Sequence, residues 1–306
     1  MSRAWVIAIV LAGAAGIVLA LAVVRLGVRQ TAASRQYVDQ PEYAVWGGLV
    51  LLQLPAWAVL GVVSAWWASE TRALPPDDDR PVWQVGLGWL GSALVIGVLV
   101  LAQQWAMQLA YPRFYPDHLV LRVGVMTVVG ALAAGVPAVG LWGISRAVAA
   151  IDPASPGAVD RFALLWSRQR DLLVVLSLML AMAVLTTAAR LQANNGFTPG
   201  GGPPLPEAPP TYILVQGAIF GAILLVLYLP PYYANRRVGE RLALTLCPRS
   251  EDGFGDAWFA GRDERQRCRA ALGLEEGTRE HLQRGVVLLA PLLTALATTL
   301  VPGIGG

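Results

Sequence analysis

Three consecutive acidic residues, Asp77 to Asp79, are the most concentrated group of potential metal ligands in the sequence. Carboxylate oxygens bind hard divalent cations, so the triplet raises the question of a metal site. Consecutive side chains point in different directions, however, whereas a metal site needs ligands that converge. The triplet also follows two prolines, Pro75 and Pro76. We therefore expect a solvated turn here, and no metal site.

Cys247, Cys268 and His281 are the other residues that could approach a metal ion. They are separated by 21 and then 13 residues, which matches no pattern of closely spaced zinc ligands. Both cysteines fall in a segment that we place in the cytoplasm, where thiols stay reduced, so a disulfide is not expected. No metal and no cofactor is predicted.

Catalytic constellations are also missing from the sequence. Intramembrane proteolysis needs a serine with a base, paired aspartates within spans or a His-Glu-x-x-His helix, and none is present. Every arginine, aspartate and glutamate falls at or beyond the end of a predicted span, whereas ion-coupled carriers commonly use an intramembrane carboxylate. The sequence therefore indicates a protein that is not an enzyme.

The pattern best suited to binding a partner lies near the C-terminus. Trp258 and Phe259 precede a charged helix that contains Arg262, Arg265 and Arg269. Aromatic residues beside arginines are typical anchors of protein interfaces. Two alternatives are a charged face that meets water or anionic headgroups, and aromatic side chains that insert into the membrane interface. The binding hypothesis predicts a cytoplasmic protein partner for these five residues.

Composition sets the environment in which these residues work. The chain has 306 residues, of which 56% are hydrophobic and only 14% are charged, against about 25% charged in soluble proteins. All basic residues are arginine, which is typical of a GC-rich bacterium. The formal charge of +3, with acidic residues interleaved among the arginines, gives no footprint for nucleic acid. We expect a protein of the bacterial inner membrane, embedded in the lipid bilayer.

Seven apolar segments predict membrane spans, because about 20 apolar residues cross the hydrocarbon core. Residues 1–234 form the bundle, residues 235–285 form a cytoplasmic charged helical segment beyond a break at Pro230-Pro231, and residues 286–306 hold a seventh span and the C-terminus. The seventh span is short and could instead re-enter or dock on the bundle. The predicted fold is all-α, a polytopic transmembrane helical bundle of about seven spans with a small cytoplasmic helical subdomain. The predicted spans are residues 4–24, 46–67, 83–110, 119–150, 172–189, 212–229 and 286–301.

Small residues recur every four positions along the first span, at Ala8, Ala12, Gly16 and Ala20. Such a ridge lets another helix approach closely. The neighbour could belong to this chain or to a second copy, so a homo-oligomer is one possibility, and an alanine-rich span can also produce such a ridge by composition alone. A cleaved signal peptide is the competing interpretation of this segment, although its apolar run exceeds the usual 7 to 15 residues.

The distribution of arginines predicts the orientation of the chain. With the N-terminus inside and seven spans, the inner segments carry 17 arginines and the outer segments carry 6. Basic residues are retained on the cytoplasmic side. We expect a cytoplasmic N-terminus and a C-terminus outside.

Three function hypotheses follow. The first is a non-enzymatic scaffold, anchor or sensor that presents its cytoplasmic segment to a partner. The second is a transporter or channel subunit, in which prolines within spans and a stripe of Ala290, Thr294 and Thr298 would form gates or a pore lining. The third is a lipid-modifying enzyme, which would require a metal at Asp77 to Asp79.

Overall fold

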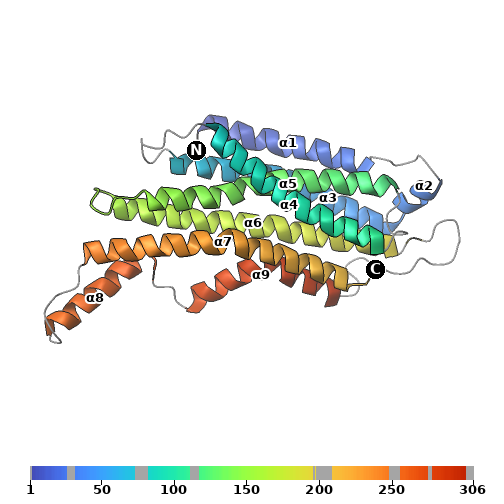
Figure 1. Ribbon diagram of the computed structural model, residues 1–306. Coiled ribbons are helices and arrows are strands. Elements are labelled where there is room, and N and C mark those ends of the chain that lie inside the picture. The colour runs from blue at the N-terminus through green and yellow to red at the C-terminus, as the bar shows by residue number, and fades with distance from the viewer. Residues whose placement is uncertain are drawn as a thin grey trace.

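The computed structural model describes residues 2–25, 32–72, 82–110, 117–195, 197, 209–247, 256–274 and 278–300. All regular secondary structure in these residues is helical, which confirms the predicted fold class. Figure 1 shows the helices arranged as an elongated bundle. They are α1 (Arg3–Arg25), α2 (Ala32–Val38), α3 (Pro41–Arg72), α4 (Val82–Ala110), α5 (Asp117–Ala149), α6 (Ala158–Asn195), α7 (Thr211–Leu246), α8 (Asp256–Ala271) and α9 (Thr278–Leu300).

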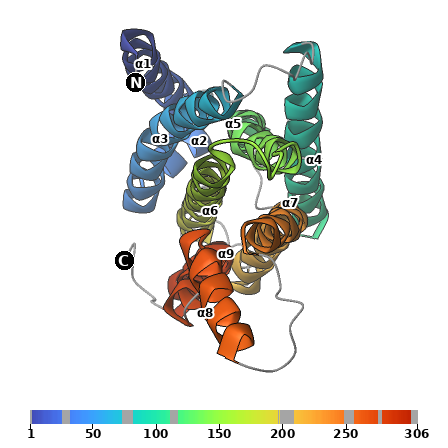
Figure 2. The ribbon, with the colours of Figure 1, turned by 90° about the vertical axis from the view of Figure 1, so that its left-hand side faces the viewer.

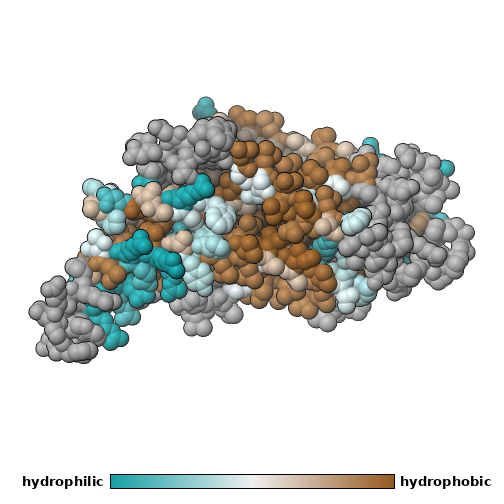
Figure 3. Space-filling model, in the orientation of Figure 1, coloured by the Kyte–Doolittle hydropathy of each residue, from teal (hydrophilic) through white to brown (hydrophobic). Residues whose placement is uncertain are grey.

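Six of these helices, α1 and α3 to α7, are long and apolar enough to cross a membrane. Large aliphatic side chains point outward from them, as Leu94 and Val95 do on α4 and Val10 does on α1. Figure 3 shows the result on one face, a broad hydrophobic band across the middle of the bundle. Side chains exposed in this way are stable only against an apolar surrounding, so the band indicates a lipid bilayer environment.

The seventh predicted span corresponds to α9, whose apolar part is the shorter stretch Gly285–Thr299. This helix packs along α6 and α7. Contact with α7 is close, because a Cβ on Gly217 would lie 2.9 Å from the carbonyl oxygen of Pro291. About seven spans is thus roughly consistent with the structure, with α9 docked on the bundle.

Helix α6 occupies the middle of the bundle and packs against α3, α5, α7 and α9. Helices α1 and α4 lie at its edges, α1 against α3 and α4 against α5 (Figure 2). Helix α2 lies at one end of the bundle and α8 at the other (Figure 1). These two ends are called the α2 end and the α8 end below.

The predicted break at Pro230-Pro231 is wrong, because α7 continues through both prolines to Leu246. Each proline removes one backbone hydrogen bond of the helix. Packing against α6 compensates: Pro231, Tyr232 and Asn235 are buried, and Asn235 Nδ2 donates a 2.6 Å hydrogen bond to Gln169 Oε1. The first part of the predicted cytoplasmic segment therefore belongs to α7.

Helix α8 folds back onto the last turns of α7. It ends where Gly273 adopts a left-handed conformation with φ of 67°, which glycine tolerates without steric cost. The turn buries Leu272 and Leu274, and Leu274 reaches the surface of α7 at Gly239. The rest of α8 projects from the bundle (Figure 1).

Candidate functional site

A cavity of about 70 Å³ lies inside the bundle, among α3, α4, α5, α6 and α7. Its lining runs along α5 from Val123 to Ala134 and along α6 from Arg190 back to Met179. At 1.5 Å per residue, each stretch covers about 16 Å. Most lining residues are apolar, and the polar ones gather towards the α2 end. The cavity is thus a narrow space parallel to the helices, with chemically different ends.

Arg190 is the only charged residue among the described residues that line the cavity. Its side chain comes from the last turns of α6 and only 5% of the residue's surface is exposed. The NH1 group donates a hydrogen bond to Gln104 Oε1 on α4 over 3.4 Å. A guanidinium group offers five N–H donors in a planar fork, so it suits a carboxylate or phosphate better than any other side chain does.

Two glutamine–threonine pairs lie next to Arg190 in the lining. Gln216 Nε2 on α7 donates to Thr187 Oγ1 over 3.1 Å, and Thr186 Oγ1 donates to Gln53 Oε1 on α3. Gln216 is buried, and its Oε1 atom has no hydrogen-bond partner among the described residues. A buried acceptor without a partner costs about 1–3 kcal/mol, so this oxygen favours a donor in the cavity.

A second buried arginine lies just beyond the cavity, at the α2 end. Arg122 has no exposed surface, and its NH1 group donates to Tyr43 Oη over 2.8 Å. Tyr43 in turn donates to the carbonyl oxygen of Val24 over 2.7 Å. The ring of Tyr43 packs 5.3 Å from that of Trp46, which lines the cavity.

Tyr37 closes this end of the bundle from α2. Its hydroxyl donates to Asn194 Oδ1 over 2.6 Å, and its ring meets those of Tyr43 and Phe197 edge to face. Burial raises the pKa of Tyr37, and the charges of Arg190 and Arg122 oppose that rise only in part. The phenol therefore stays protonated and keeps its hydrogen bond at physiological pH.

The opposite end of the cavity is apolar. Trp57, Met179, Leu180 and Ala134 line it, and Trp57 Nε1 donates to the carbonyl oxygen of Met179 over 3.2 Å. The absence of a side chain at Gly130 makes room for the Trp57 ring, because a Cβ on Gly130 would lie 2.7 Å from Trp57 Cη2. The polar group of the tryptophan is thus satisfied by the wall, and only its apolar ring faces the cavity.

Helix α4 forms one long wall with Ile96, Val100 and Gln104. In the described residues α4 packs extensively only on α5, while Gln216 and Phe220 of α7 line the cavity as well. Side chains of α4 and α7 therefore face the same cavity.

The residues predicted to bind a partner lie at the α8 end, far along the bundle from this cavity. Arg262, Arg265 and Arg269 line a groove of about 410 Å³ between α7 and α8, and Arg269 NH2 pairs with Glu240 Oε1 at 2.8 Å. Trp258 and Phe259 belong to α8, but their side chains lie outside the described part of the structure. The structure thus brings the three arginines together on one groove.

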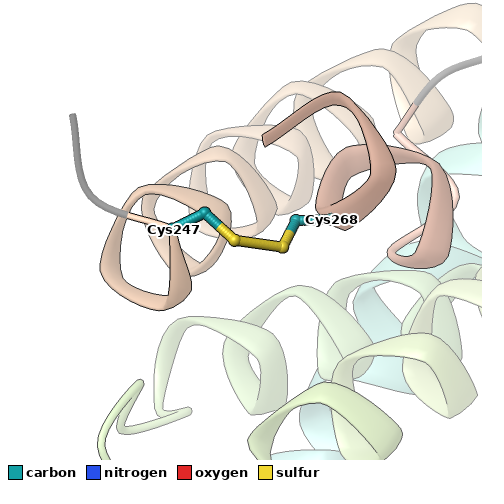
Figure 4. Close-up of a disulfide and its surroundings, with 2 residues drawn as sticks. All are labelled: Cys247 and Cys268. Carbon is teal, nitrogen blue, oxygen red and sulfur yellow. A yellow bond between two sulfur atoms is a disulfide. The ribbon is translucent and has the colours of Figure 1, made fainter. Parts of the chain in front are cut away.

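Cys247 and Cys268 form a disulfide between the end of α7 and α8 (Figure 4). The expectation of two reduced thiols is wrong for this structure. It rested on the compartment assigned to the segment, and a separation of 21 residues carries no sign that α8 folds back alongside α7. The bridge fixes one side of the groove that holds the three arginines.

The small-residue ridge of α1 lies against α3. Gly16 and Ala20 are buried, and a Cβ on Gly16 would lie 2.8 Å from the backbone nitrogen of Pro55. Ala8 and Ala12 are partly buried. In this structure the neighbour of the ridge is a helix of the same chain.

The remaining candidate residues from the sequence form no site in the described structure. Asp77 to Asp79 and the side chain of His281 lie outside the described residues, in which no three His, Cys, Asp or Glu side chains converge. On α9, Thr294 Oγ1 donates to the carbonyl oxygen of Ala290, and Thr298 Oγ1 to that of Thr294. These hydroxyls bond to their own helix and do not line the cavity.

Sequence reasoning missed the cavity because it placed Arg122 and Arg190 at or near span ends and took such positions as solvated. A signal was present: Ala183, Thr186, Thr187 and Arg190 recur at spacings of three and four residues, which puts them on one face of α6. That face points inward only because α6 continues to Asn195.

Comparison with known protein families, characterised proteins and solved structures finds no match for this chain.

Proposed function

We propose that this protein is a non-enzymatic sensor of the bacterial inner membrane, which binds an amphipathic molecule from the bilayer and presents α8 to a cytoplasmic partner. The observation that carries the proposal is the cavity itself. Its α2 end is lined by Arg190, Gln104 and Gln216, and its other end by aromatic and aliphatic side chains. A molecule with a polar group at one end and an apolar group at the other is complementary to both ends, and the volume of about 70 Å³ restricts it to a small one.

Access from the bilayer supports an amphiphile over a water-soluble ligand. Helix α4 forms one wall of the cavity, and its outer surface is strongly apolar. An amphiphile dissolved in the membrane could enter sideways, with its head at the depth of Arg190. A water-soluble molecule would have to pass the aromatic cluster of α2 and α3.

The sensor part of the proposal rests on α7. The same helix lines the cavity with Gln216 and Phe220 and, at its other end, forms the arginine groove with α8 through Glu240 and Ala243. A change in the position of α7 on binding would therefore reach the groove. A soluble partner with acidic groups fits the three arginines of α8.

The first experiment is extraction in native lipid followed by mass analysis of what remains bound. Val100 lines the cavity on α4, so Val100→Trp fills the space, whereas Val98 is exposed to lipid on the same helix. We expect the wild type and Val98→Trp to retain one amphiphile in fixed ratio and Val100→Trp to lose it. Equal retention by all three contradicts the cavity as the binding site.

The same preparation tests the partner. A soluble protein that copurifies in fixed ratio and is lost on deletion of residues 256–271 is the result that the sensor hypothesis requires. Purification of the chain alone or as a homo-oligomer contradicts it.

A carrier is the second candidate function. It is favoured by Pro55, which lies in the middle of α3 two residues after the cavity-lining Gln53 and weakens the helix there. A carrier would move the bound amphiphile across proteoliposome membranes, and Val100→Trp would stop the flux. A sensor would bind without flux.

Orientation completes the proposal. The excess of arginines near the α8 end favours a cytoplasmic α8. A disulfide in that compartment would be open to reduction. Single cysteines at exposed positions of α8, introduced in a variant without Cys247 and Cys268, should resist an impermeant thiol reagent in intact cells; labelling without lysis contradicts this orientation.

A further inference from the structure

The buried apolar contacts that hold α8 on α7 lie in the turn that ends α8. Leu272 and Leu274 of this turn are buried, and a Cβ on Gly239 of α7 would lie 2.7 Å from Leu274 Cδ2. Further towards the start of α8, residues 262–264 are exposed. The turn therefore anchors α8, and the rest of the helix needs other links to stay beside α7.

The middle of α8 is linked to α7 by an ion pair and by the Cys247–Cys268 bridge (Figure 4). Arg269 NH2 lies 2.8 Å from Glu240 Oε1, and both side chains are partly exposed. Such pairs contribute little to stability, because water screens the charges and two long side chains lose their freedom. The bridge is covalent, so it is the stronger of these two links.

Cys268 lies on the face of α8 that is turned to α7. Leu272, four residues later, is buried, and Arg265, three residues earlier, is partly buried and lines the arginine groove. Glu264 and Arg267, on the other side of α8, are exposed. The bridge therefore pins to α7 the same face of α8 that forms the groove.

The two cysteines differ in exposure, which gives reduction a direction. Cys247 is buried, whereas Cys268 is partly exposed, so a dithiol reductant attacks the sulfur of Cys268 first. This step forms a mixed disulfide and releases Cys247 as a thiolate, which takes up a proton. The second thiol of the reductant then frees Cys268 and becomes part of the reductant's own disulfide. The protein gains two electrons and two protons, and the reverse exchange with an oxidised dithiol closes the bridge again.

We propose that the Cys247–Cys268 bridge is a thiol–disulfide switch that sets the position of α8. In the oxidised state α8 lies against α7, and its three arginines form the groove with Glu240. In the reduced state α8 pivots on the turn at Leu272 and the groove opens. In a reducing compartment the open state is the resting one, and oxidation closes it. For the partner this inference rests on the proposed function: an acidic partner binds the oxidised form.

The test is amide hydrogen exchange of the full chain in nanodiscs, after oxidation with diamide and after reduction with dithiothreitol. We expect the amides of residues 262–271 to exchange at least about tenfold faster after reduction, because a charged helix of 16 residues that loses its packing is marginal in water. The amides of α9, which packs on α6 and α7, are the internal control and should not change. Equal exchange of α8 in the two states overturns the switch.

Variants assign the effect to the bridge. Cys268→Ser should exchange at the fast rate with and without dithiothreitol. Arg269→Gln, which removes only the ion pair, should leave the slow rate of the oxidised protein unchanged. Slow exchange in Cys268→Ser would show that other contacts clamp α8 and overturns the proposal. The wild-type comparison of the two states decides the inference even if a variant fails to fold.

The state of the bridge in cells is read by trapping thiols with acid and alkylating them, before and after diamide. We expect free thiols at rest and a bridge after diamide. A bridge that is complete at rest, or thiols that diamide never joins, overturns the switch.

The partner separates this inference from the proposed function. A soluble protein that copurifies equally with the oxidised and the reduced chain leaves the proposed function standing and overturns redox control of the groove. Copurification with neither form contradicts the proposed function, while amide exchange still decides whether the bridge moves α8.

Discussion

Two arginines of α6, Arg168 at the α8 end and Arg190 at the α2 end, are held in opposite ways. Arg168 is partly exposed, pairs with Glu70 at 2.9 Å and Asp171 at 3.4 Å, and lies over the rings of Trp66 and Trp67. Arg190 is buried on the wall of the cavity, and its NH1 group donates a 3.4 Å hydrogen bond to the neutral amide of Gln104.

This difference in surroundings indicates different roles for the two guanidinium groups. Carboxylates neutralise Arg168 within the protein, and its role is complete without a ligand: it ties α6 to α3 at the membrane edge. Arg190 lies on the wall of the cavity, whose described lining contains no carboxylate. A buried charge is costly to maintain, and buried charges on the wall of a cavity are typical of binding sites.

The largest change in stability is expected for Arg122→Ala. Arg122 shares the buried environment of Arg190, and the change leaves a cavity and removes the hydrogen bond to Tyr43. We expect a loss of about 3 kcal/mol in the free energy of unfolding, measured from the unfolding midpoint in SDS. A gain in stability would mean that the desolvation cost outweighs the network, which would contradict our account of the α2 end.

The next largest change in stability is expected for Gly130→Ala, and Gly143→Ala on the same helix serves as its control. A methyl group at Gly130 collides with the Trp57 ring, whereas nothing lies within 4 Å of a Cβ at Gly143. We expect the first change to cost about 1–3 kcal/mol and to shift the tryptophan fluorescence, because overpacking displaces the ring. Gly143→Ala should leave the fluorescence unchanged and keep the stability equal or raise it by up to about 1 kcal/mol; equal losses in both variants would argue against a packed wall at Trp57.

Tyr37 makes the α2 end sensitive to alkali. Burial raises the pKa of Tyr37 in the folded protein, while the unfolded residue titrates near 10. Stability is thus complete below about pH 10 and falls as pH rises further, since only the unfolded chain can then release the proton. The unfolding midpoint should drop between about pH 10 and 11.5 in the wild type and less so in Tyr37→Phe; identical curves would contradict the shift.

The smallest effect is expected for Arg168→Gln. Its ion pairs are partly exposed, and such pairs contribute about 0.2–1 kcal/mol. The unfolding midpoint should fall by no more than that, and by less at high salt, while binding of an amphiphile stays the same. A loss of binding would show that the two arginines do not differ in the way proposed.

The fold was accessible from sequence because hydrophobic segments and their lengths are local properties. Helix α5 is predicted within two residues at its start and one at its end, and the start of α7 within one. The ends of α6 and α7 are not local properties: packing of Asn235 on Gln169 carries α7 past two prolines that propensity alone would place at a break.

The cavity could not be predicted from the sequence, because it too depends on packing between distant helices. Whether Arg190 meets water or the interior depends on α4 and α7, which lie far away in sequence. The disulfide also depends on a chain reversal, between α7 and α8, that no spacing reveals. Burial of polar groups is a tertiary property, so the residues that matter most for function were the hardest to recognise.

The length of α7 has a mechanical consequence. From Gln216 in the cavity to Cys247 beside α8 the helix runs 31 residues, about 46 Å at 1.5 Å per residue. A stiff rod of that length amplifies: a tilt of about 5° at the cavity would swing the far end by about 4 Å, which is comparable to the diameter of a side chain. The Cys247–Cys268 bridge couples α8 to the moving tip.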